Sequence, residues 1–380
     1  MNESMRISIL GSTGSIGRQT LDVAARLGVT VTALAAGKNT DAMEADARRF
    51  HPQLVAMADE AAARDLRTRL ADTDIRVEAG EDGVMQVAVA EADRTFGAVV
   101  GVAGLRPCLA AIEAGRTLAL GNKETLVCGG ALVTEAVKRH GTRLIPVDSE
   151  HSAVYQCLQG HKNNKKRILL TASGGPFFGR TRAELENVTV AQALAHPNWS
   201  MGAKITVDSA TMVNKGLEII EAGWLFGAKE SEIDVLVHRQ SVVHSMVEFE
   251  DGVVLAQLGT PDMRAPIAYA LTEPERVDFG GKHLDLASYA GLTFEKPDEI
   301  TFPATAVARQ VMREGGAAPI IFNGANEAAV ALFLAGKLRF LEITERIMDA
   351  LARVPHTPVH SVEDILAVDE LARQAVREGR

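Results

Sequence analysis

Three acidic residues have the type and spacing needed to hold a divalent cation. Asp148 and Glu150 lie two positions apart, directly after the apolar run 144–147. If this segment is extended, side chains two positions apart point to the same side, so both carboxylates can face one point. Glu218, on a helix predicted over 209–226, is the candidate for a third ligand. Hard ions such as Mg2+ and Mn2+ prefer oxygen ligands of this kind.

The helix that carries Glu218 could also bind an anion. Its predicted start at Ser209 has a Ser or Asp cap, and Asn214 and Lys215 follow within two turns. A helix N-terminus with hydroxyl, amide and ammonium groups suits phosphate, and Ser173 in a glycine-rich turn could add a donor. In the alternative reading, the serines only cap a helix and fill a turn, and Lys215 only pairs with Glu218. The functional reading predicts a short phosphate ester with chelating oxygens as the substrate.

A loop between Ser173 and Ser209 contains one of the two tryptophans. The loop is His196-Pro197-Asn198-Trp199-Ser200-Met201-Gly202. Trp199 could act as a lid that excludes water when substrate binds, or it could only anchor the loop. His196 could donate a hydrogen bond to phosphate, or it could be a solvated loop histidine. The residues alone leave both questions open.

A glycine-rich turn near the N-terminus indicates a dinucleotide site. The sequence Gly11-Ser12-Thr13-Gly14-Ser15-Ile16-Gly17 follows the predicted strand 7–10 and opens a helix. Glycines let the backbone approach a pyrophosphate, and the helix N-terminus supplies N–H groups. The spacing GxxGxxG only partly meets the usual fingerprint. In this strand–turn–helix context, cofactor binding is the favoured interpretation.

Two further segments bear on the cofactor. The second strand ends in Gly37-Lys38-Asn39 without the acid that NAD enzymes place there, which favours the 2′-phosphate of NADPH. A solvated loop lysine is the alternative. Gly121-Asn122-Lys123-Glu124 follows another strand, where ligands of open α/β sheets bind, although it could be only a helix start.

The surrounding chain supplies the elements that must position these groups. Apolar runs predict strands at 7–10, 29–35, 54–57, 75–77, 98–100, 117–120 and 144–147, with helical stretches between them. This alternation predicts an α/β fold with an N-terminal Rossmann-type parallel sheet, a central α+β catalytic domain and a C-terminal helical bundle. The predicted domains are 1–147 for NADPH, 148–287 for metal, substrate and lid, a linker at 288–302, and 303–380. Ser361 and Asp364 predict a helix cap before 365–376.

Composition excludes several classes of protein. The formal net charge of -9 argues against general binding to nucleic acid or an anionic membrane. Three cysteines without a CxxC pair argue against a disulfide framework and favour a reducing compartment. The sequence shows neither a signal peptide nor an apolar run of the roughly 18 residues that a membrane helix needs. We therefore expect a cytoplasmic protein.

Several motifs together resemble one known family. GSTGSIG, GNKE, PVDSEHSA, ASGGPF, HPNWSMG and DSATMVNKGLE closely match the 1-deoxy-D-xylulose-5-phosphate reductoisomerase family of the non-mevalonate isoprenoid pathway. The resemblance runs from the first strand to the C-terminal helices. It implies an NADP-dependent oxidoreductase, usually a homodimer, that rearranges and reduces 1-deoxy-D-xylulose 5-phosphate to 2-C-methyl-D-erythritol 4-phosphate with a divalent metal as Lewis acid.

The resemblance also implies roles for individual residues. The metal (Mg2+, Mn2+ or Co2+) would be bound by Asp148, Glu150 and Glu218. The catalytic residues would be Lys123, Ser149 and Glu150. The substrate would be contacted by Ser149, Lys123, Ser173, His196, Trp199, Met201, Ser209, Asn214 and Lys215. NADPH would be contacted by Thr13, Gly14, Ser15, Ile16, Gly37, Lys38, Asn39, Asn122, Glu124 and Gly202.

Two other functions compete with this one. A metal-free NADPH-dependent semialdehyde reductase would need a nucleophilic cysteine, for which Cys157 in an apolar helical stretch is the one candidate. A non-catalytic NADPH sensor would need neither the lid loop nor the acidic cluster. Both leave Asp148, Glu150 and Glu218 without a role.

Overall fold

The computed structural model describes residues 5–161, 164–199 and 201–379. The chain divides into two compact units. The first unit comprises residues 1–125, 131–152 and 262–282, and the second comprises residues 126–130, 153–261 and 283–380. Residues 262–282 thus group with the N-terminal sheet, although they lie inside the segment predicted to be catalytic.

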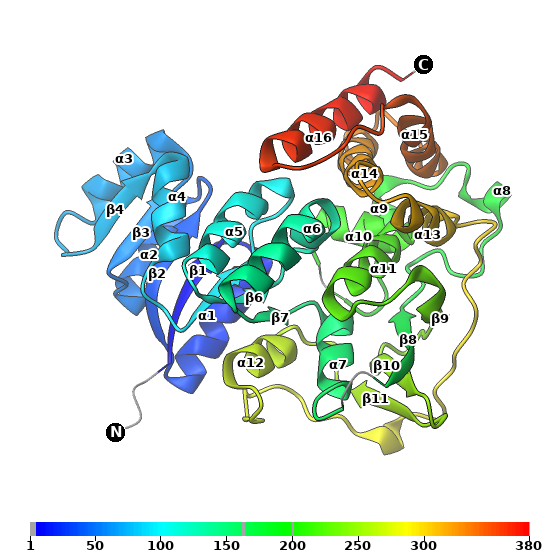
Figure 1. Cartoon of the computed structure of the whole chain (residues 1–380), viewed down its shortest axis with the longest axis horizontal. Coiled ribbons are helices and arrows are strands. Elements are labelled where there is room, and N and C mark those ends of the chain that lie inside the picture. Colours follow the sequence, from blue (N-terminus) through cyan, green and yellow to red (C-terminus); the bar gives the residue numbers. More distant parts are fainter. Residues whose placement is uncertain (1–4, 162–163, 200, 380) are drawn as a thin grey trace. The chain divides into compact units, whose positions relative to one another are not determined.

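The first unit is built on a seven-stranded parallel sheet with the order β4-β3-β2-β1-β5-β6-β7 (Figure 1). Its strands are β1 (Arg6–Leu10), β2 (Thr30–Ala36), β3 (Leu54–Met57), β4 (Arg76–Ala79), β5 (Arg94–Gly97), β6 (Thr117–Leu120) and β7 (Leu144–Pro146). Short continuous apolar runs suit such strands, because helices cover a parallel sheet and leave no wet face. All four residues of β3 are buried, for example. The predicted α/β class with a parallel sheet is confirmed.

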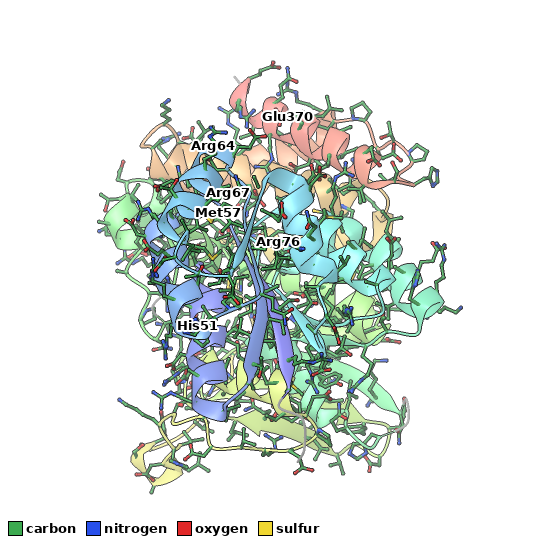
Figure 2. All side chains as sticks on the ribbon, turned by 90° about the vertical axis from the view of Figure 1, so that its left-hand side faces the viewer. His51, Met57, Arg64, Arg67, Arg76 and Glu370 are labelled. Atoms are coloured by element: carbon green, nitrogen blue, oxygen red, sulfur yellow. The ribbon has the colours of Figure 1, made fainter. Side chains whose placement is uncertain are left out.

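Helices alternate with these strands along the chain. They are α1 (Ser15–Leu27), α2 (Thr40–Phe50), α3 (Glu60–Arg69), α4 (Gly80–Val89), the short η1 (Val102–Gly104), α5 (Leu105–Glu113) and, from the later segment, α12 (Arg264–Thr272). Helix α4 packs against β1 to β4, α5 packs against β5 and β6, and α12 packs against α1 and β7. Figure 2 labels Arg67 on α3, whose guanidinium donates to the Val77 carbonyl at 2.7 Å and fixes the edge strand β4.

The strand order reverses at β1, which lies between β2 and β5. Ligands of open α/β sheets bind beyond the carboxyl ends of the strands at such a point. Gly11 follows β1 with a φ of 87°, and a Cβ there would lie 2.5 Å from the Ala98 carbonyl oxygen just after β5. A Cβ on Gly17 would lie 2.5 Å from the Ser12 carbonyl oxygen. Both glycines are therefore required by close backbone approach at the ligand edge of the sheet.

The strand predicted at 98–100 is wrong, because β5 ends at Gly97 and residues 98–100 are irregular. The true strand begins with Arg94, a charged residue that is only 8% exposed. Its guanidinium donates to the Ala270 carbonyl and lies 3.4 Å from the Glu273 carboxylate. Both partners come from the distant segment 262–282, so local hydropathy could not reveal that this arginine is buried.

The second unit contains a four-stranded sheet with the order β11-β10-β8-β9. Its strands are β8 (Lys165–Ala172), β9 (Ile233–Val237), β10 (Val243–Phe249) and β11 (Val254–Leu258). Strand β10 is antiparallel to β8 and β11, whereas β8 and β9 are parallel. The helices before and after β9 are α8 (Arg182–Leu185), α9 (Val190–Ala193), α10 (Ala203–Ala210), α11 (Val213–Phe226), η2 (Glu230–Glu232) and η3 (Leu286–Ser288).

The second unit ends in four packed helices, which confirms the predicted C-terminal helical region. They are α13 (Ala304–Glu314), α14 (Ala318–Leu334), α15 (Phe340–Arg353) and α16 (Val362–Arg377). Helix α14 contacts the other three and is buried on most sides (Figure 1). The Ser361 hydroxyl accepts the Asp364 N–H at 3.1 Å, so the predicted cap of α16 is confirmed. Helices α6 (Lys123–His140) and α7 (Ser149–Cys157) contribute residues to both units.

No helix in the described part of the chain has the length and apolar character needed to cross a membrane.

The buried pair of Arg94 and Glu273 gives a test of this fold. The Glu273→Ala variant would leave the Arg94 charge buried without its carboxylate, and removal of one partner of a buried pair costs about 3 kcal/mol. We expect the urea midpoint of unfolding to fall accordingly. The same change at exposed Glu275 is the control and should leave the midpoint unchanged. A Glu273→Ala midpoint equal to that of wild type would show that the pair does not hold α12 to the sheet.

Candidate active site

The predicted pyrophosphate turn has the geometry of an anion cradle. Helix α1 begins at Ser15, and its N-cap is Gly14, which provides no side-chain cap. The first-turn N–H groups of a helix have no partner within the helix, so they are left for an external acceptor. Thr13, Gly14 and Ile16 are partly accessible, and Ser15 is exposed. The structure therefore places this part of the predicted cofactor set on one exposed turn.

Lys38 lies in the loop after β2, and β2 is the neighbour in the sheet of β1, which the glycine-rich turn follows. Gly37, Lys38 and Asn39 are all exposed. Asn39 caps α2, because its side-chain oxygen accepts the Ala42 N–H at 3.1 Å. Lys38 follows the carboxyl end of β2, the neighbour of β1. An ammonium at this position can meet a phosphate carried by the ribose of a bound dinucleotide.

The segment Gly121–Glu124 begins helix α6 at the same edge of the sheet. A Cβ on Gly121 would lie 3.2 Å from the Ile16 side chain, which places this segment beside the start of α1. The Asn122 side chain accepts the Thr125 N–H at 2.6 Å and donates to the Gly101 carbonyl at 3.0 Å. Asn122 and Glu124 are both buried. The Asn122 amide is thus occupied by the protein, which leaves its backbone for a ligand.

Lys123 forms an ion pair with Asp148 within the first unit. The ammonium nitrogen lies 2.6 Å from a carboxylate oxygen, and His151 Nδ1 lies 3.4 Å from the same oxygen. Burial opposes ionisation of Asp148, but the Lys123 charge and His151 outweigh it and hold the pKa of this carboxyl well below its usual range. The next residues are hydrogen-bonded too, since the Ser149 hydroxyl donates to Glu150 at 2.6 Å. Asp148 is therefore held as an anion.

The extended conformation predicted for Asp148 to Glu150 is wrong. The Asp148 carbonyl accepts the Ser152 N–H at 2.7 Å, so helix α7 begins at Ser149 and Glu150 lies in its first turn. Acidic side chains at a helix N-terminus are favoured by the positive end of the helix dipole. These residues form the start of a helix instead of an extended segment.

The single helix predicted over 209–226 is also wrong. Helix α10 ends at Ala210, the chain turns through Met212 with a φ of 64°, and α11 begins at Val213. Ser209 is therefore in the last turn of α10 and caps nothing. The Thr211 hydroxyl donates to the Val207 carbonyl at 3.1 Å, which helps to terminate α10. Ser209 and Asn214 lie on either side of this break.

Helix α11 holds a second buried carboxylate with a lysine partner. Glu218 is 0% exposed and Lys215 is 3% exposed, and the Lys215 ammonium donates to one carboxylate oxygen of Glu218. The Asn214 amide donates to the other oxygen at 2.5 Å. A buried charge persists only when it is paired and hydrogen-bonded, so Glu218 remains an anion here. The ion pair between Lys215 and Glu218, which was the alternative interpretation of the sequence, is present. It also keeps the Glu218 carboxylate in the ionised form that a metal ion needs.

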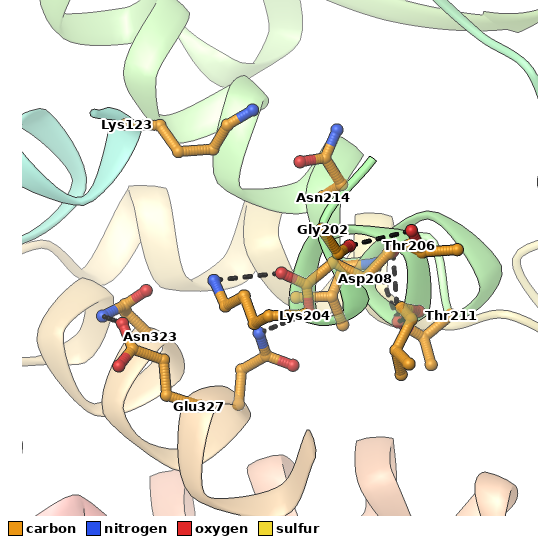
Figure 3. A network of polar contacts seen from close by, with 12 residues as sticks. Lys123, Gly202, Lys204, Thr206, Asp208, Thr211, Asn214, Asn323 and Glu327 are labelled. Carbon is orange, nitrogen blue, oxygen red and sulfur yellow. Dashed lines mark hydrogen bonds and ion pairs between the residues drawn. The ribbon is translucent and has the colours of Figure 1, made fainter. Parts of the chain in front are cut away.

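Helix α10 is anchored to the C-terminal helices through Asp208. Figure 3 shows Asp208 with the Lys204 ammonium, at 3.0 Å, and the Asn326 amide of α14 donates to its other oxygen at 2.8 Å. The Thr206 hydroxyl donates to the Gly202 carbonyl at 2.8 Å. Asp208 is 1% exposed, so this anchor is an interior contact. It fixes the helix that directly follows the tryptophan loop and carries Ser209.

The contacts of His196 fix its tautomer. Its Nδ1 accepts the N–H groups of Asn198 at 3.2 Å and Trp199 at 3.0 Å, so the proton of the neutral ring is on Nε2. Nε2 then donates to the Ser173 hydroxyl at 2.9 Å, which also accepts the Gly175 N–H at 3.2 Å. Burial, and then the Arg239 charge, lower the pKa of His196, which keeps the ring neutral. Two accepted bonds leave the Ser173 hydroxyl proton to donate to a ligand.

The second unit brings the predicted phosphate residues together. A Cβ on Gly175 would lie 2.8 Å from the Ser209 carbonyl oxygen, so the glycine turn lies against the end of α10. Trp199 is half-buried, with its ring 6.1 Å from that of His244, which agrees with an aromatic that anchors its loop. Gly202 is exposed at the N-cap of α10, and Met201 is partly buried. Ser200 lies outside the described residues.

Sequence reasoning missed several residues that contact this set. Arg239 and Ser241 contact the glycine turn and the tryptophan loop, and His151 contacts Asp148. His151 lies within the PVDSEHSA motif, although no role was predicted for it, and Arg239 lies in a short polar stretch between two apolar strands.

Comparison with models of known protein families shows to which family the chain belongs. The model of 1-deoxy-D-xylulose 5-phosphate reductoisomerase matches residues 7–130, and two models of C-terminal domains of the same protein match residues 144–226 and 258–375. The chain belongs to the 1-deoxy-D-xylulose 5-phosphate reductoisomerase family. The predicted resemblance is therefore confirmed.

Members of the family match almost the whole chain. The Agathobacter rectalis member is 54% identical over 370 residues, and the Acetivibrio thermocellus member is 53% identical over 377 residues, covering 97% and 98% of both chains respectively. A reductoisomerase from Zymomonas mobilis, solved in complex with NADPH, is 42% identical with a TM-score of 0.93 and covers 99% of this chain and 98% of that one. Another, solved with NADPH, fosmidomycin and magnesium, is 40% identical with a TM-score of 0.92 and covers 98% and 97%.

Proposed function

We propose that this chain converts 1-deoxy-D-xylulose 5-phosphate into 2-C-methyl-D-erythritol 4-phosphate with NADPH and a divalent metal ion. The observation that carries this proposal is family membership over nearly the full length of the chain, with relatives solved with NADPH and with magnesium. The side chains that the reaction needs have suitable surroundings in both units.

The proposed metal ligands are Asp148, Glu150 and Glu218. Their donor atoms are all carboxylate oxygens, and oxygen-only sites suit Mg2+, Mn2+ or Co2+. Asp148 and Glu218 each form an ion pair with a lysine of the same unit. The ion pair keeps each carboxylate ionised, and an ionised carboxylate can bind a cation. The bound ion would supply Lewis-acid stabilisation to the substrate oxygens.

We propose that the substrate phosphate binds to the second unit. The donors would be the hydroxyls of Ser173 and Ser209, the Asn214 amide and the Lys215 ammonium, with His196 behind Ser173. The Ser173 hydroxyl accepts two hydrogen bonds from the protein, so its own proton can be donated to a phosphate, which supports this assignment. Fixing the phosphate would keep the reacting carbons oriented during rearrangement. Trp199 and Met201, in the loop before α10, would exclude water from the substrate.

Lys123, Ser149 and Glu150 are the proposed catalytic residues beside the substrate's backbone oxygens. The Lys123 ammonium donates to Asp148, and the Ser149 hydroxyl donates to Glu150. Both side chains are partly buried, and we propose that each exchanges that acceptor for a substrate oxygen. Such short exchanges suit groups that hold or move a proton during rearrangement.

We place NADPH on the turn after β1. The N–H groups of Ser15 and Ile16 at the start of α1 would bind its pyrophosphate, and Lys38 would bind its 2′-phosphate. NADPH supplies the hydride for the reduction. The other proposed contacts are Thr13, Gly14, Gly37, Asn39, Asn122, Glu124 and Gly202.

The competing semialdehyde reductase is not favoured. Cys157 and Cys128 are buried, and burial raises the pKa of Cys108 to about 12. A buried thiol with a raised pKa is a poor nucleophile. The three free cysteines also agree with the reducing cytoplasm as the expected compartment.

Removal of the metal or of one ligand tests the activity. We expect NADPH oxidation with 1-deoxy-D-xylulose 5-phosphate and Mg2+ to stop when EDTA is added. Glu218→Gln keeps the shape of the side chain but not its charge, so the rate should fall by at least roughly 10- to 100-fold, the range that changes around metal sites produce.

The Glu314→Gln variant is the matched control for that experiment, since Glu314 is exposed at the end of α13 in the same unit. Its rate should equal that of wild type. A cooperative urea unfolding transition checks that each variant is folded, since both substitutions lie in the second unit. Folded wild-type protein that binds NADPH but does not oxidise it with any divalent metal would contradict the proposal and favour the sensor.

Lys38→Gln tests the cofactor site. Loss of a charged hydrogen bond to the 2′-phosphate costs about 1.5–3 kcal/mol, so KM for NADPH should rise roughly 10- to 100-fold. The KM for NADH should change little, because NADH lacks that phosphate. Lys138→Gln, at an exposed lysine of α6, is the control. Equal effects on both cofactors would remove Lys38 from the 2′-phosphate site.

We also propose a homodimer. Strand β11 is the edge of its sheet, and Val253, Val254 and Leu258 expose 51%, 43% and 36% of their surface. An unprotected apolar edge strand is a ready surface for pairing with another chain. Sedimentation velocity should give about twice the 40.6 kDa of one chain. A monomer at micromolar concentration would contradict this proposal.

A further inference from the structure

The four residues after β9 send their side chains alternately to two sides. On one side, His238 Nδ1 donates to the Thr293 carbonyl at 2.8 Å, and the Gln240 amide donates to the Thr293 hydroxyl at 3.0 Å. On the other side, Arg239 and Ser241 contact the glycine turn and the tryptophan loop. These four residues form a turn, in which the Ser241 N–H donates to the His238 carbonyl at 3.2 Å. Thr293 therefore holds this segment on one side, and the residues of the proposed phosphate site contact it on the other.

The Arg239 guanidinium holds the turn that carries Ser173. Its Nη1 donates to the Ser173 carbonyl at 2.6 Å and to the Gly175 carbonyl at 2.7 Å. The same guanidinium lies over the Phe178 ring, 4.9 Å from its centroid. Two carbonyls two positions apart on a glycine turn are thereby held by one nitrogen. The turn would otherwise depend on Gly174 and Gly175, whose φ values of 76° and 64° reflect backbone freedom.

The backbone of Arg239 holds the tryptophan loop. The Asn198 amide donates to the Arg239 carbonyl at 2.7 Å and to the Ser241 hydroxyl at 2.9 Å. Ser241 has a φ of 51°, a left-handed conformation that non-glycine residues adopt rarely and at a cost. Met212, between α10 and α11, is another. Strained residues of this kind gather where the surrounding structure must hold a precise geometry.

We propose that Arg239 is a positioning residue, which holds Ser173 and His196 in the arrangement that binds the substrate phosphate. This inference rests on the proposed function. Arg239 reaches Ser173 through its side chain and the His196 loop through its backbone, so one residue sets the distance between the two partners. Its charge also adds to burial in lowering the pKa of His196, and the neutral ring is the form that donates to Ser173.

A positioning role predicts a specific kinetic change. Without the guanidinium, the Ser173 turn gains freedom that phosphate binding must remove, so affinity for the substrate falls. All of the proposed NADPH contacts except Gly202 lie in the first unit, so NADPH binding should change little. We expect Arg239→Met to raise KM for 1-deoxy-D-xylulose 5-phosphate roughly 10-fold, to change kcat less, and to leave KM for NADPH nearly unchanged.

Arg309 provides a matched control. Its Nη1 also donates to two backbone carbonyls, those of Glu230 and Ile233, both at 2.6 Å, and it too is partly buried in the second unit. Arg309→Met therefore removes the same interactions from a place with no proposed ligand. It should lower the unfolding midpoint while leaving KM for the substrate at its wild-type value. Arg239→Gln, which retains a donor, serves if Arg239→Met does not fold.

The outcomes separate the two proposals. A raised KM for the substrate in the Arg239 variants alone supports the inference. A wild-type KM in the Arg239 variants, or an equal rise in Arg309→Met, would overturn it while the proposed function stands. Failure of the wild-type protein itself to turn over the substrate would overturn the proposed function instead.

Discussion

A buried carboxylate stays ionised only if an opposite charge and hydrogen bonds replace the water it has lost. The chain meets this requirement twice, with Asp148 beside Lys123 and Glu218 beside Lys215. Each lysine comes from the same unit as its acid. The remaining features of the proposed site follow from this constraint. Both pairs lie at helix starts, in α6 and α7 and in the first turns of α11, where backbone N–H groups and short side chains supply further donors.

Close backbone approach is the second constraint, and glycines satisfy it. Gly11 and Gly17 bring the turn after β1 against its neighbours, and Gly175 brings the Ser173 turn against α10. In each case a Cβ would lie within 2.8 Å of a carbonyl oxygen. The two proposed ligand-binding turns are thus built alike, because one side of each is packed too tightly for a side chain. Anion binding by backbone groups needs this kind of rigid, narrow turn.

The sequence predicted the parts of the fold that depend on local pattern. Six predicted strands of the N-terminal sheet and the Ser361 cap are confirmed, because apolar runs and cap residues act over short distances. The errors share a different cause. The strand at 94–97 begins with an arginine whose partners come from residues 270 and 273, and the break at Met212 depends on packing that hydropathy does not encode. The candidate ligands were found from motifs. Arg239 was missed, because its partners are backbone carbonyls, which have no sequence signature.

Charge explains why a metal ion and an anionic substrate belong together in the proposed site. The three proposed ligand acids carry three negative charges, and Lys123 and Lys215 carry two positive ones, which leaves one net negative charge. A divalent ion alone would turn this into one net positive charge, and a phosphate dianion alone would leave three negative charges. With both ligands the net charge is minus one again, the value of the protein alone. Since uncompensated charge is costly where water is excluded, the two ligands should favour each other's binding. The pairing of Asp148 and Glu218 with lysines therefore shapes affinity for both ligands as well as the stability of each unit.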